Sequence, residues 1–165
     1  MPLTNFPSLP ANARVWVFAC DRSLVREEAR PLLDQVDAYL AQWTAHGAPL
    51  RCARDWRHDR FLAIGIDPTA EQASGCSIDD LFRRLRAAGD SIGVRVLGGG
   101  QVFYRDEKGS VQSASRVEFA EMAVRGDVTE GTPIFDTSVI TADDWRERFE
   151  RPTGDAWTAE LLPTS

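Results

Sequence analysis

The stretch Arg14-Val15-Trp16-Val17-Phe18-Ala19-Cys20 is the starting point for working out the fold. Its β-branched and aromatic side chains form a short apolar run, which is typical of a buried central strand. A helix is expected next, because Ser23 can serve as its N-cap and an apolar face continues to His46, where Gly47 ends it. Pro31 either lies in the first turn of a helix that begins later or kinks a longer one.

Two hairpins are expected further along the chain. Residues 50–56 and 60–66 alternate between apolar and polar side chains, and the polar Arg57-His58-Asp59 joins them. Two alternating runs separated by a short polar turn are typical of a hairpin. Residues 101–104 and 110–113 flank a turn that contains aspartate and glycine, and they predict a second hairpin.

A second helix between the two hairpins completes the order strand, helix, strand, strand, helix, strand. This order is that of the split βαβ, or ferredoxin-like, arrangement, in which an antiparallel sheet carries both helices on one face. The sequence therefore predicts an α+β fold of this kind, followed by a helix over residues 117–125 and an irregular tail. We expect a single domain with a core of residues 1–114, on which an acidic extension, residues 115–165, packs through Trp145 and Trp157.

The chain has 165 residues and a net charge of −6 at pH 7, and its acidity lies toward the C-terminal end. Residues 1–105 carry 13 basic and 12 acidic groups, whereas residues 106–165 carry 6 and 13. Binding to nucleic acid depends on a clustered cationic face, which the sequence does not indicate. With nucleic acid set aside as a partner, we expect any macromolecular partner to be another protein. The sequence specifies no oligomeric state.

The chain start and the cysteines bear on the cellular compartment. No apolar run approaches the roughly 20 residues that cross a bilayer, and residues 1–10 lack the basic and apolar regions of a signal peptide. Cys20, Cys52 and Cys76 are odd in number and lie inside predicted elements, which favours free thiols in a reducing compartment. The sequence therefore predicts a cytoplasmic protein that does not bind a membrane.

The sharpest candidate site is Ser74-Gly75-Cys76-Ser77-Ile78-Asp79. Ser77 is expected to cap the second helix, with Asp80 in capping-box position, so that the thiol of Cys76 lies at the helix N-terminus. Backbone N–H groups and the helix dipole stabilise a thiolate there and can also hold a small anion. The candidate ligand-binding residues are Ser74, Gly75 and Ser77. The alternative interpretation, to which we give roughly equal weight, is that Cys76 is an inert thiol packed under a loop.

His46 and Asp79 are candidate partners of this thiol. His46 could act as its base, and the predicted catalytic residues are therefore Cys76, His46 and Asp79. The alternative is that His46 is a cation favoured by the negative end of the first helix. No cysteines or histidines have the spacing of a zinc site, and Gly98-Gly99-Gly100 precedes a strand instead of a helix. We therefore expect no metal and no other cofactor.

The Ser-Gly-Cys-Ser-Ile-Asp signature, together with Trp43-x-x-His46-Gly47 and Val15-Trp16-Val17, resembles a family of small bacterial proteins. The resemblance covers most of the chain. Some members are called ABC transporter ATPases, but this sequence has neither a phosphate loop nor its acidic strand partner, so ATPase activity is not implied. The chain also departs from the family pattern, because Asp80-Leu81 follows the signature in place of small hydroxyl residues.

Two classes of function remain. The first is a cytosolic, non-enzymatic binding or adaptor protein whose surface, or whose acidic C-terminal third, contacts another protein. The second is a thiol-dependent enzyme or redox sensor that uses Cys76. Small-anion binding at the same loop is compatible with either class.

Overall fold

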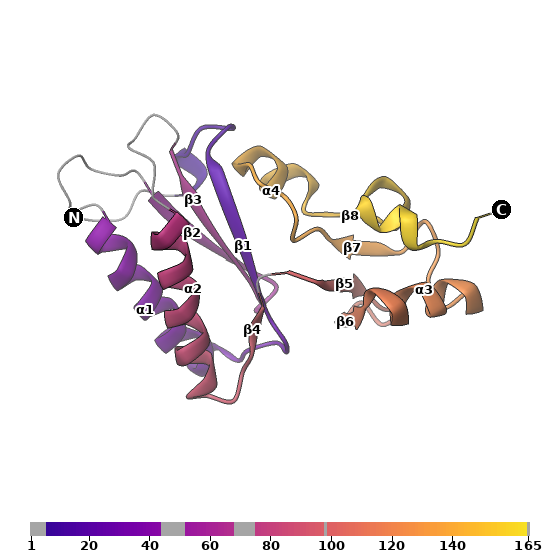
Figure 1. Ribbon diagram of the computed structural model, residues 1–165, viewed down its shortest axis with the longest axis horizontal. Coiled ribbons are helices and arrows are strands. Elements are labelled where there is room, and N and C mark those ends of the chain that lie inside the picture. Colours follow the sequence, from indigo (N-terminus) through magenta and orange to yellow (C-terminus); the bar gives the residue numbers. More distant parts are fainter. Residues whose placement is uncertain (1–5, 44–51, 68–74, 98, 165) are drawn as a thin grey trace. The chain divides into compact units, whose positions relative to one another are not determined.

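The computed structural model describes residues 6–43, 52–67, 75–97 and 99–164 (Figure 1). The chain forms two compact units. Unit 1 contains residues 1–98 and 139–145, and unit 2 contains residues 99–138 and 146–165. Because the chain returns to unit 1 after unit 2 has begun, each unit is discontinuous in the sequence.

Unit 1 contains a four-stranded sheet in the order β2-β3-β1-β4, and each neighbouring pair of strands is antiparallel. Its strands are β1 (Arg14–Cys20), β2 (Cys52–Arg57), β3 (Phe61–Ile66) and β4 (Val96–Leu97). In the chain, helix α1 (Arg26–Trp43) lies between β1 and β2, and helix α2 (Gly75–Asp90) lies between β3 and β4. The bounds of β1 are confirmed, and so is the first hairpin, although its described strands cover residues 52–57 and 61–66 where 50–56 and 60–66 were predicted.

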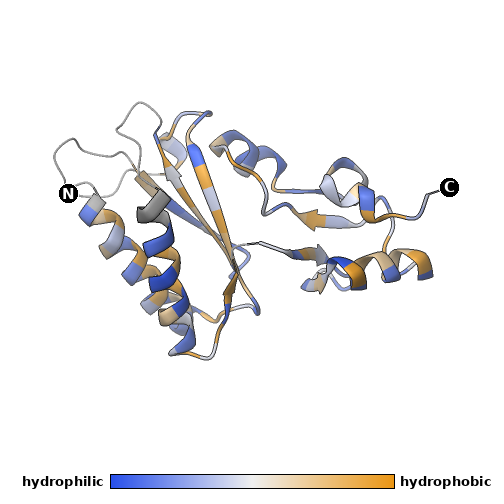
Figure 2. Cartoon of the chain, in the orientation of Figure 1, coloured by the Kyte–Doolittle hydropathy of each residue, from blue (hydrophilic) through white to orange (hydrophobic). Residues whose placement is uncertain are grey.

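One face of this sheet is covered by α1 and α2. Leu32, Val36 and Leu40 of α1 are buried, as the predicted apolar face requires, and they share one core with Leu81 of α2 and Ile64 of β3. Hydrophobic residues run along the central strands (Figure 2). Each buried leucine or isoleucine contributes about 1.5–3 kcal/mol. Helix α1 begins at Arg26, five residues before Pro31. Of the two alternatives given for this proline, the structure has the longer helix, with Pro31 inside it.

The other face of the sheet is also covered. The 3-10 helix η1 (Phe6–Ser8) and Leu9 lie so close to β3 that a Cβ atom on Gly65 would be 2.6 Å from Leu9 Cδ1. Residues 139–145 run beside the start of β1, where the N–H of Val15 donates to the carbonyl of Ile140 over 2.9 Å. All six residues of β3 are buried in consequence.

The turn between β2 and β3 depends on a buried arginine. His58 and Asp59 have positive φ angles of 57° and 55°, a conformation that both residue types adopt more readily than most. The next residue, Arg60, is buried, and its guanidinium donates to the carbonyl oxygens of Cys20 and Asp21 over 2.9 and 2.8 Å. Burial lowers the pKa of this guanidinium below its ordinary value. Arg60 thus joins the turn to the end of β1.

The carboxylate of Asp55 on β2 binds three groups. Its Oδ1 accepts the N–H of Trp56, at 3.0 Å, and its Oδ2 accepts Nε1 of Trp145, at 2.9 Å, and Nε of Arg57, at 3.2 Å. Arg57 also donates to the carbonyl of Trp145 over 2.7 Å, and its guanidinium lies 4.5 Å from the centre of the indole ring. Trp145 is completely buried. These contacts attach residues 139–145 to the sheet of unit 1.

The fourth strand of this sheet differs from the prediction. The hairpin over residues 101–113 was expected to supply it, but β4 is only Val96–Leu97, which pairs with Ala19 and Cys20 of β1. The hairpin exists but belongs to the sheet of unit 2. A strand of two residues beside a glycine run is too short to show any periodicity in the sequence.

Unit 2 contains a second four-stranded antiparallel sheet, in the order β6-β5-β7-β8. Its strands are β5 (Gln101–Arg105), β6 (Val111–Ser115), β7 (Pro133–Phe135) and β8 (Glu150–Pro152). The helices after the hairpin are α3 (Arg116–Arg125), η2 (Thr153–Asp155) and η3 (Trp157–Leu161) in unit 2, and α4 (Ala142–Arg148), which begins in unit 1 and ends in unit 2. The expectation of an irregular tail was therefore wrong.

Helix α3 covers one face of the second sheet, close to the residues predicted. It begins with a capping box in which the Ser115 hydroxyl accepts the N–H of Glu118 and the Glu118 side chain accepts the N–H of Ser115. It ends at Gly126, where φ is 82°. Phe119 is buried against Val102 of β5, and Trp157 of η3 packs against the same core. Each tryptophan of the C-terminal third is therefore packed within its own unit.

We expect Asp55→Ala to lower the free energy of unfolding of unit 1 by about 1–3 kcal/mol, because the buried N–H of Trp145 loses its acceptor. Urea denaturation followed by tryptophan fluorescence would measure the loss. Asp34→Ala is the control, because Asp34 is an exposed carboxylate of α1 in the same unit. Equal destabilisation by the two substitutions would contradict the role given to Asp55.

Candidate functional site

The site predicted at the start of the second helix is described only in part. Helix α2 begins at Gly75, so Gly75, Cys76 and Ser77 lie in its first turn. Ser77 was predicted to be the N-cap, the residue just before the helix, but it lies inside the helix. The side chains of Cys76 and Ser77 lie outside the described residues, as do Ser74 and His46 altogether. Asp79 is exposed on α2. Whether Cys76, His46 and Asp79 come together therefore stays a prediction.

Asp80 joins α2 to α1. Its Oδ2 accepts the hydroxyl of Tyr39 over 2.9 Å, and its two oxygens also accept guanidinium groups of Arg84 and Arg83, each at 3.3 Å. The hydrogen bond from Tyr39 is the main cause that lowers the pKa of the Asp80 carboxyl, and the arginines act in the same direction. Asp80 thus has partners that the predicted capping box did not include.

Cys20 and Cys52 are free thiols in the core of unit 1. Burial raises the pKa of Cys20 to about 12 and that of Cys52 to about 11. The thiol of Cys52 donates to the carbonyl of Leu40 over 3.7 Å. Because the thiolate is the reactive form, both cysteines are inert at neutral pH. Thiol chemistry of the folded chain therefore reports on Cys76.

We expect iodoacetamide to modify Cys76 alone in the folded protein at pH 7, and faster than a model thiol, because the first turn of a helix favours the thiolate. The rate should be followed from pH 5 to pH 9, with the modified residue located by mass spectrometry. Cys76→Ser is the control and should abolish labelling until the protein is unfolded. Labelling of Cys76 no faster than that of a model thiol would eliminate the thiol-dependent function.

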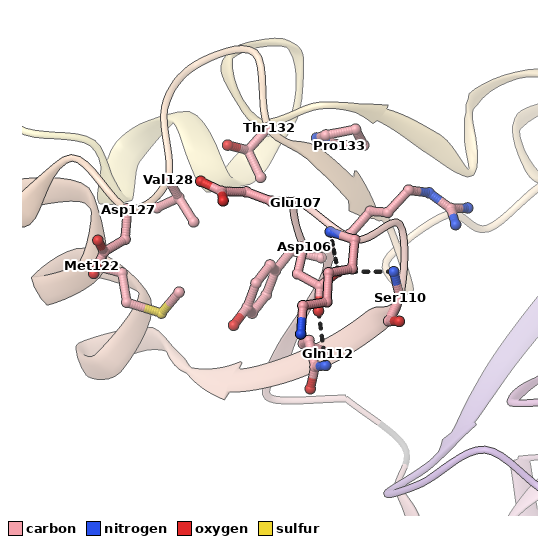
Figure 3. A pocket seen from close by; sticks show the side chains of 12 residues that line it. Asp106, Glu107, Ser110, Gln112, Met122, Asp127, Val128, Thr132 and Pro133 are labelled. Carbon is pink, nitrogen blue, oxygen red and sulfur yellow. Dashed lines mark hydrogen bonds between the residues drawn. The ribbon is translucent and has the colours of Figure 1, made fainter.

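A pocket of about 620 Å³ lies within unit 2 (Figure 3). It lies beside the C-terminal half of α3, where Met122 of the helix lines it together with Tyr104 and Gln112, the next residues after Val102 and Ala114 on the same face of the β5–β6 hairpin. Figure 3 shows Met122, Asp127 and Val128 on one side of the pocket and Asp106, Ser110 and Gln112 on the other. The remaining lining residues are Tyr104, Arg105, Glu107, Lys108, Thr132 and Pro133.

The apolar part of the pocket is formed by Tyr104, Met122 and Val128. The Tyr104 ring is half-buried and meets the ring of Phe119 edge to face, with the ring centres 5.7 Å apart and an angle of 61°. Phe119 is completely buried. The contact with this buried ring therefore fixes the Tyr104 ring against the core of unit 2.

The turn at the end of the hairpin forms a rigid wall. Oδ1 of Asp106 accepts the N–H groups of Lys108 and Ser110, each at 2.9 Å, and Oδ2 accepts the amide of Gln112 at 3.0 Å (Figure 3). The hydrogen bond from Gln112 is the main cause that lowers the pKa of the Asp106 carboxyl. Gly109 has a φ of 82°, which a residue with a side chain rarely adopts. The Asp106 charge is therefore held in place.

Negative charge surrounds the phenol of Tyr104. Burial raises the pKa of this phenol, and the carboxylates of Asp106, Glu118 and Asp127 raise it further. These three carboxylates come from the hairpin turn, from α3 and from the segment after α3. The Tyr104 hydroxyl is protonated at neutral pH, as that of an ordinary tyrosine is, and it is a hydrogen-bond donor with carboxylates nearby.

Because its pKa is raised, we expect the Tyr104 phenol to ionise above the ordinary value of about 10. Its stabilising contribution should be complete below that ordinary value and should be lost as the pH rises through the raised pKa. Titration of the absorbance at 295 nm measures the ionisation, and Tyr104→Phe should remove this component while leaving that of Tyr39. A Tyr104 component at or below pH 10 would contradict the charge arrangement of the pocket.

The sequence analysis did not find this pocket. The only signals in the sequence were the polar turn Asp106-Glu107-Lys108-Gly109 and the acidity of residues 106–165.

Among the described residues, no group of three histidine, cysteine, aspartate or glutamate side chains could hold a metal ion. In the same part of the chain, no helix has both the length and the apolar character needed to cross a membrane. No protein-family model, curated protein or solved structure matches the chain.

Proposed function

We propose that the chain is a cytosolic, non-enzymatic binding protein and that the pocket of unit 2 receives a segment of a partner protein. The observation that carries the proposal is the pocket itself, a cavity of about 620 Å³ with Tyr104 and Met122 in its lining. Cavities of about 300–1,000 Å³ are typical of binding sites, and this one combines an apolar part with several polar and charged groups. Tyrosine and methionine are also enriched in the contact surfaces between proteins.

The state of the lining groups favours binding over catalysis. Tyr104 is protonated at neutral pH, as a tyrosine ordinarily is, and burial and the nearby carboxylates disfavour its ionisation further, so it can donate a hydrogen bond but is a poor nucleophile. Asp106 already accepts three hydrogen bonds from its own turn, which oppose its protonation and hence a role as a general acid. The same groups are well suited to fixing a bound segment.

We also propose that unit 1 is a ferredoxin-like, split βαβ module and that the chain is related to the family with the Ser-Gly-Cys-Ser-Ile-Asp signature. The strand order β2-β3-β1-β4, with antiparallel neighbours, supports the first proposal. The shared core of α1, α2 and one face of the sheet supports it as well. The signature of residues 74–79 supports the second proposal.

A thiol-dependent function of Cys76 is the second candidate. It is supported by the first turn of α2, which includes Cys76, and by the burial of the other two cysteines. An exposed thiol in such a turn is favoured as a nucleophile or redox sensor. The labelling experiment described above decides on this candidate without bearing on the pocket of unit 2.

Photo-crosslinking in living cells tests the binding function. Benzoylphenylalanine at position 107, on the pocket rim, should form a covalent adduct with a partner protein, whereas the same residue at position 160 should not. Glu107 is exposed and lines the pocket, and Glu160 is also exposed but lies on η3 and not in the lining. Mass spectrometry identifies the adduct. Adducts of equal yield from both positions, or from neither, would overturn the proposal.

A further inference from the structure

We infer, building on the proposed function, that the pocket of unit 2 is specific for a cation, the side chain of an arginine or lysine in a basic segment of the partner. In the inferred complex this side chain lies against the ring of Tyr104, between the hairpin turn and Asp127. Chain charge, pocket lining and the fixed positions of the aromatic and acidic groups all favour this class of ligand.

The acidic groups around the pocket come from separate elements. Asp106 and Glu107 belong to the hairpin turn and Asp127 follows α3, and all three line the cavity. Glu118 of α3 acts on the phenol of Tyr104 together with Asp106 and Asp127. A ligand beside Tyr104 would therefore meet negative charge from several directions. Such an arrangement attracts cations and repels phosphates and carboxylates.

The basic groups near the pocket cancel this charge only in part. The guanidinium of Arg105 forms a bidentate pair with Glu150, at 2.8 and 2.9 Å, and also donates to the carbonyl of Gly109 at 2.7 Å. Arg125 pairs with Asp127 at 3.0 Å, but both side chains are more than half exposed, so water screens the pair. Lys108 is the remaining cation of the lining; it is exposed on the turn and offsets part of the Asp106 charge, but it stands against three lining carboxylates, Asp106, Glu107 and Asp127.

The groups that would hold the cation are already in place. Three hydrogen bonds hold the Asp106 carboxylate, and Phe119 supports the ring of Tyr104. Binding therefore costs little ordering of the protein. An aromatic face attracts a guanidinium or ammonium group, and two guanidinium groups of unit 2 are already stacked in this way. Arg116 lies 4.9 Å from the ring centre of Trp157, and Arg105 lies 5.1 Å from that of Phe135.

Fluorescence anisotropy with labelled peptides tests the inference on the full chain. The probe is a Gly/Ser-rich decapeptide that contains three arginines, and its counterparts contain citrulline or glutamate at the same positions. Citrulline keeps the shape of arginine but lacks its charge. We expect the arginine peptide to bind at least tenfold more tightly than the citrulline peptide and the glutamate peptide not to bind. Binding should weaken with added salt.

Variants locate the binding. Glu107→Gln combined with Asp127→Asn should weaken binding of the arginine peptide about five- to tenfold, whereas Glu147→Gln combined with Glu160→Gln should change it less than twofold. The second pair removes the same charge from exposed residues outside the lining. Tyr104→Leu should weaken binding about two- to fivefold. The bound arginine peptide should also lower the pH at which the Tyr104 absorbance changes, because a nearby cation favours the phenolate.

Each contrary result has a distinct meaning. Equal binding of the arginine and citrulline peptides, or equal weakening by the two pairs of substitutions, would overturn the cation specificity. If no peptide binds while the adduct at position 107 forms, the inference fails and the proposed binding function stands. If the adduct does not form, the proposed function fails even where the arginine peptide binds in solution.

Discussion

The carboxylate of Asp55 is the contact on which the architecture of unit 1 depends most. It accepts hydrogen bonds from Trp56, Arg57 and Trp145, and the last of these belongs to a segment that follows a large part of unit 2 in the chain. An anchored indole on this face allows the sheet to bury both of its surfaces. Every residue of β3 can therefore be apolar or a glycine, and Gly65 leaves room for Leu9.

Much of unit 1 could be predicted from the sequence, because its long elements have clear periodicity. The run 14–20 predicts β1, and the stripe of α1 predicts the buried face of that helix. Short elements escaped the prediction, because β4, β7 and β8 have two or three residues and no measurable period. The prediction assigned the hairpin over residues 101–113 to the wrong sheet for the same reason.

The pocket of unit 2 could not be predicted, because it depends on the lengths of the hairpin and of α3, which the sequence does not relate to each other. The hairpin pairs Tyr104 with Gln112 and continues beyond them, whereas α3 reaches this end of the sheet only with Phe119, against the Tyr104 ring, and with Met122. The remaining space becomes a cavity because residues between 127 and 133 line its far side. The acidity of the C-terminal third was visible in the sequence, but the element boundaries that concentrate it around Tyr104 were not.

The discontinuity of unit 1 has a consequence for biosynthesis. The ribosome completes residues 1–98 before it adds residues 139–145, and at about 5–20 residues per second the interval up to Trp145 is about 2–10 s. During this interval one face of the nascent sheet lacks its tryptophan, and its apolar side chains are accessible to chaperones. The strands β5, β6 and β7 are synthesised in the same interval. The final closure of unit 1 is therefore a late folding step, with sequence-distant contacts that form slowly.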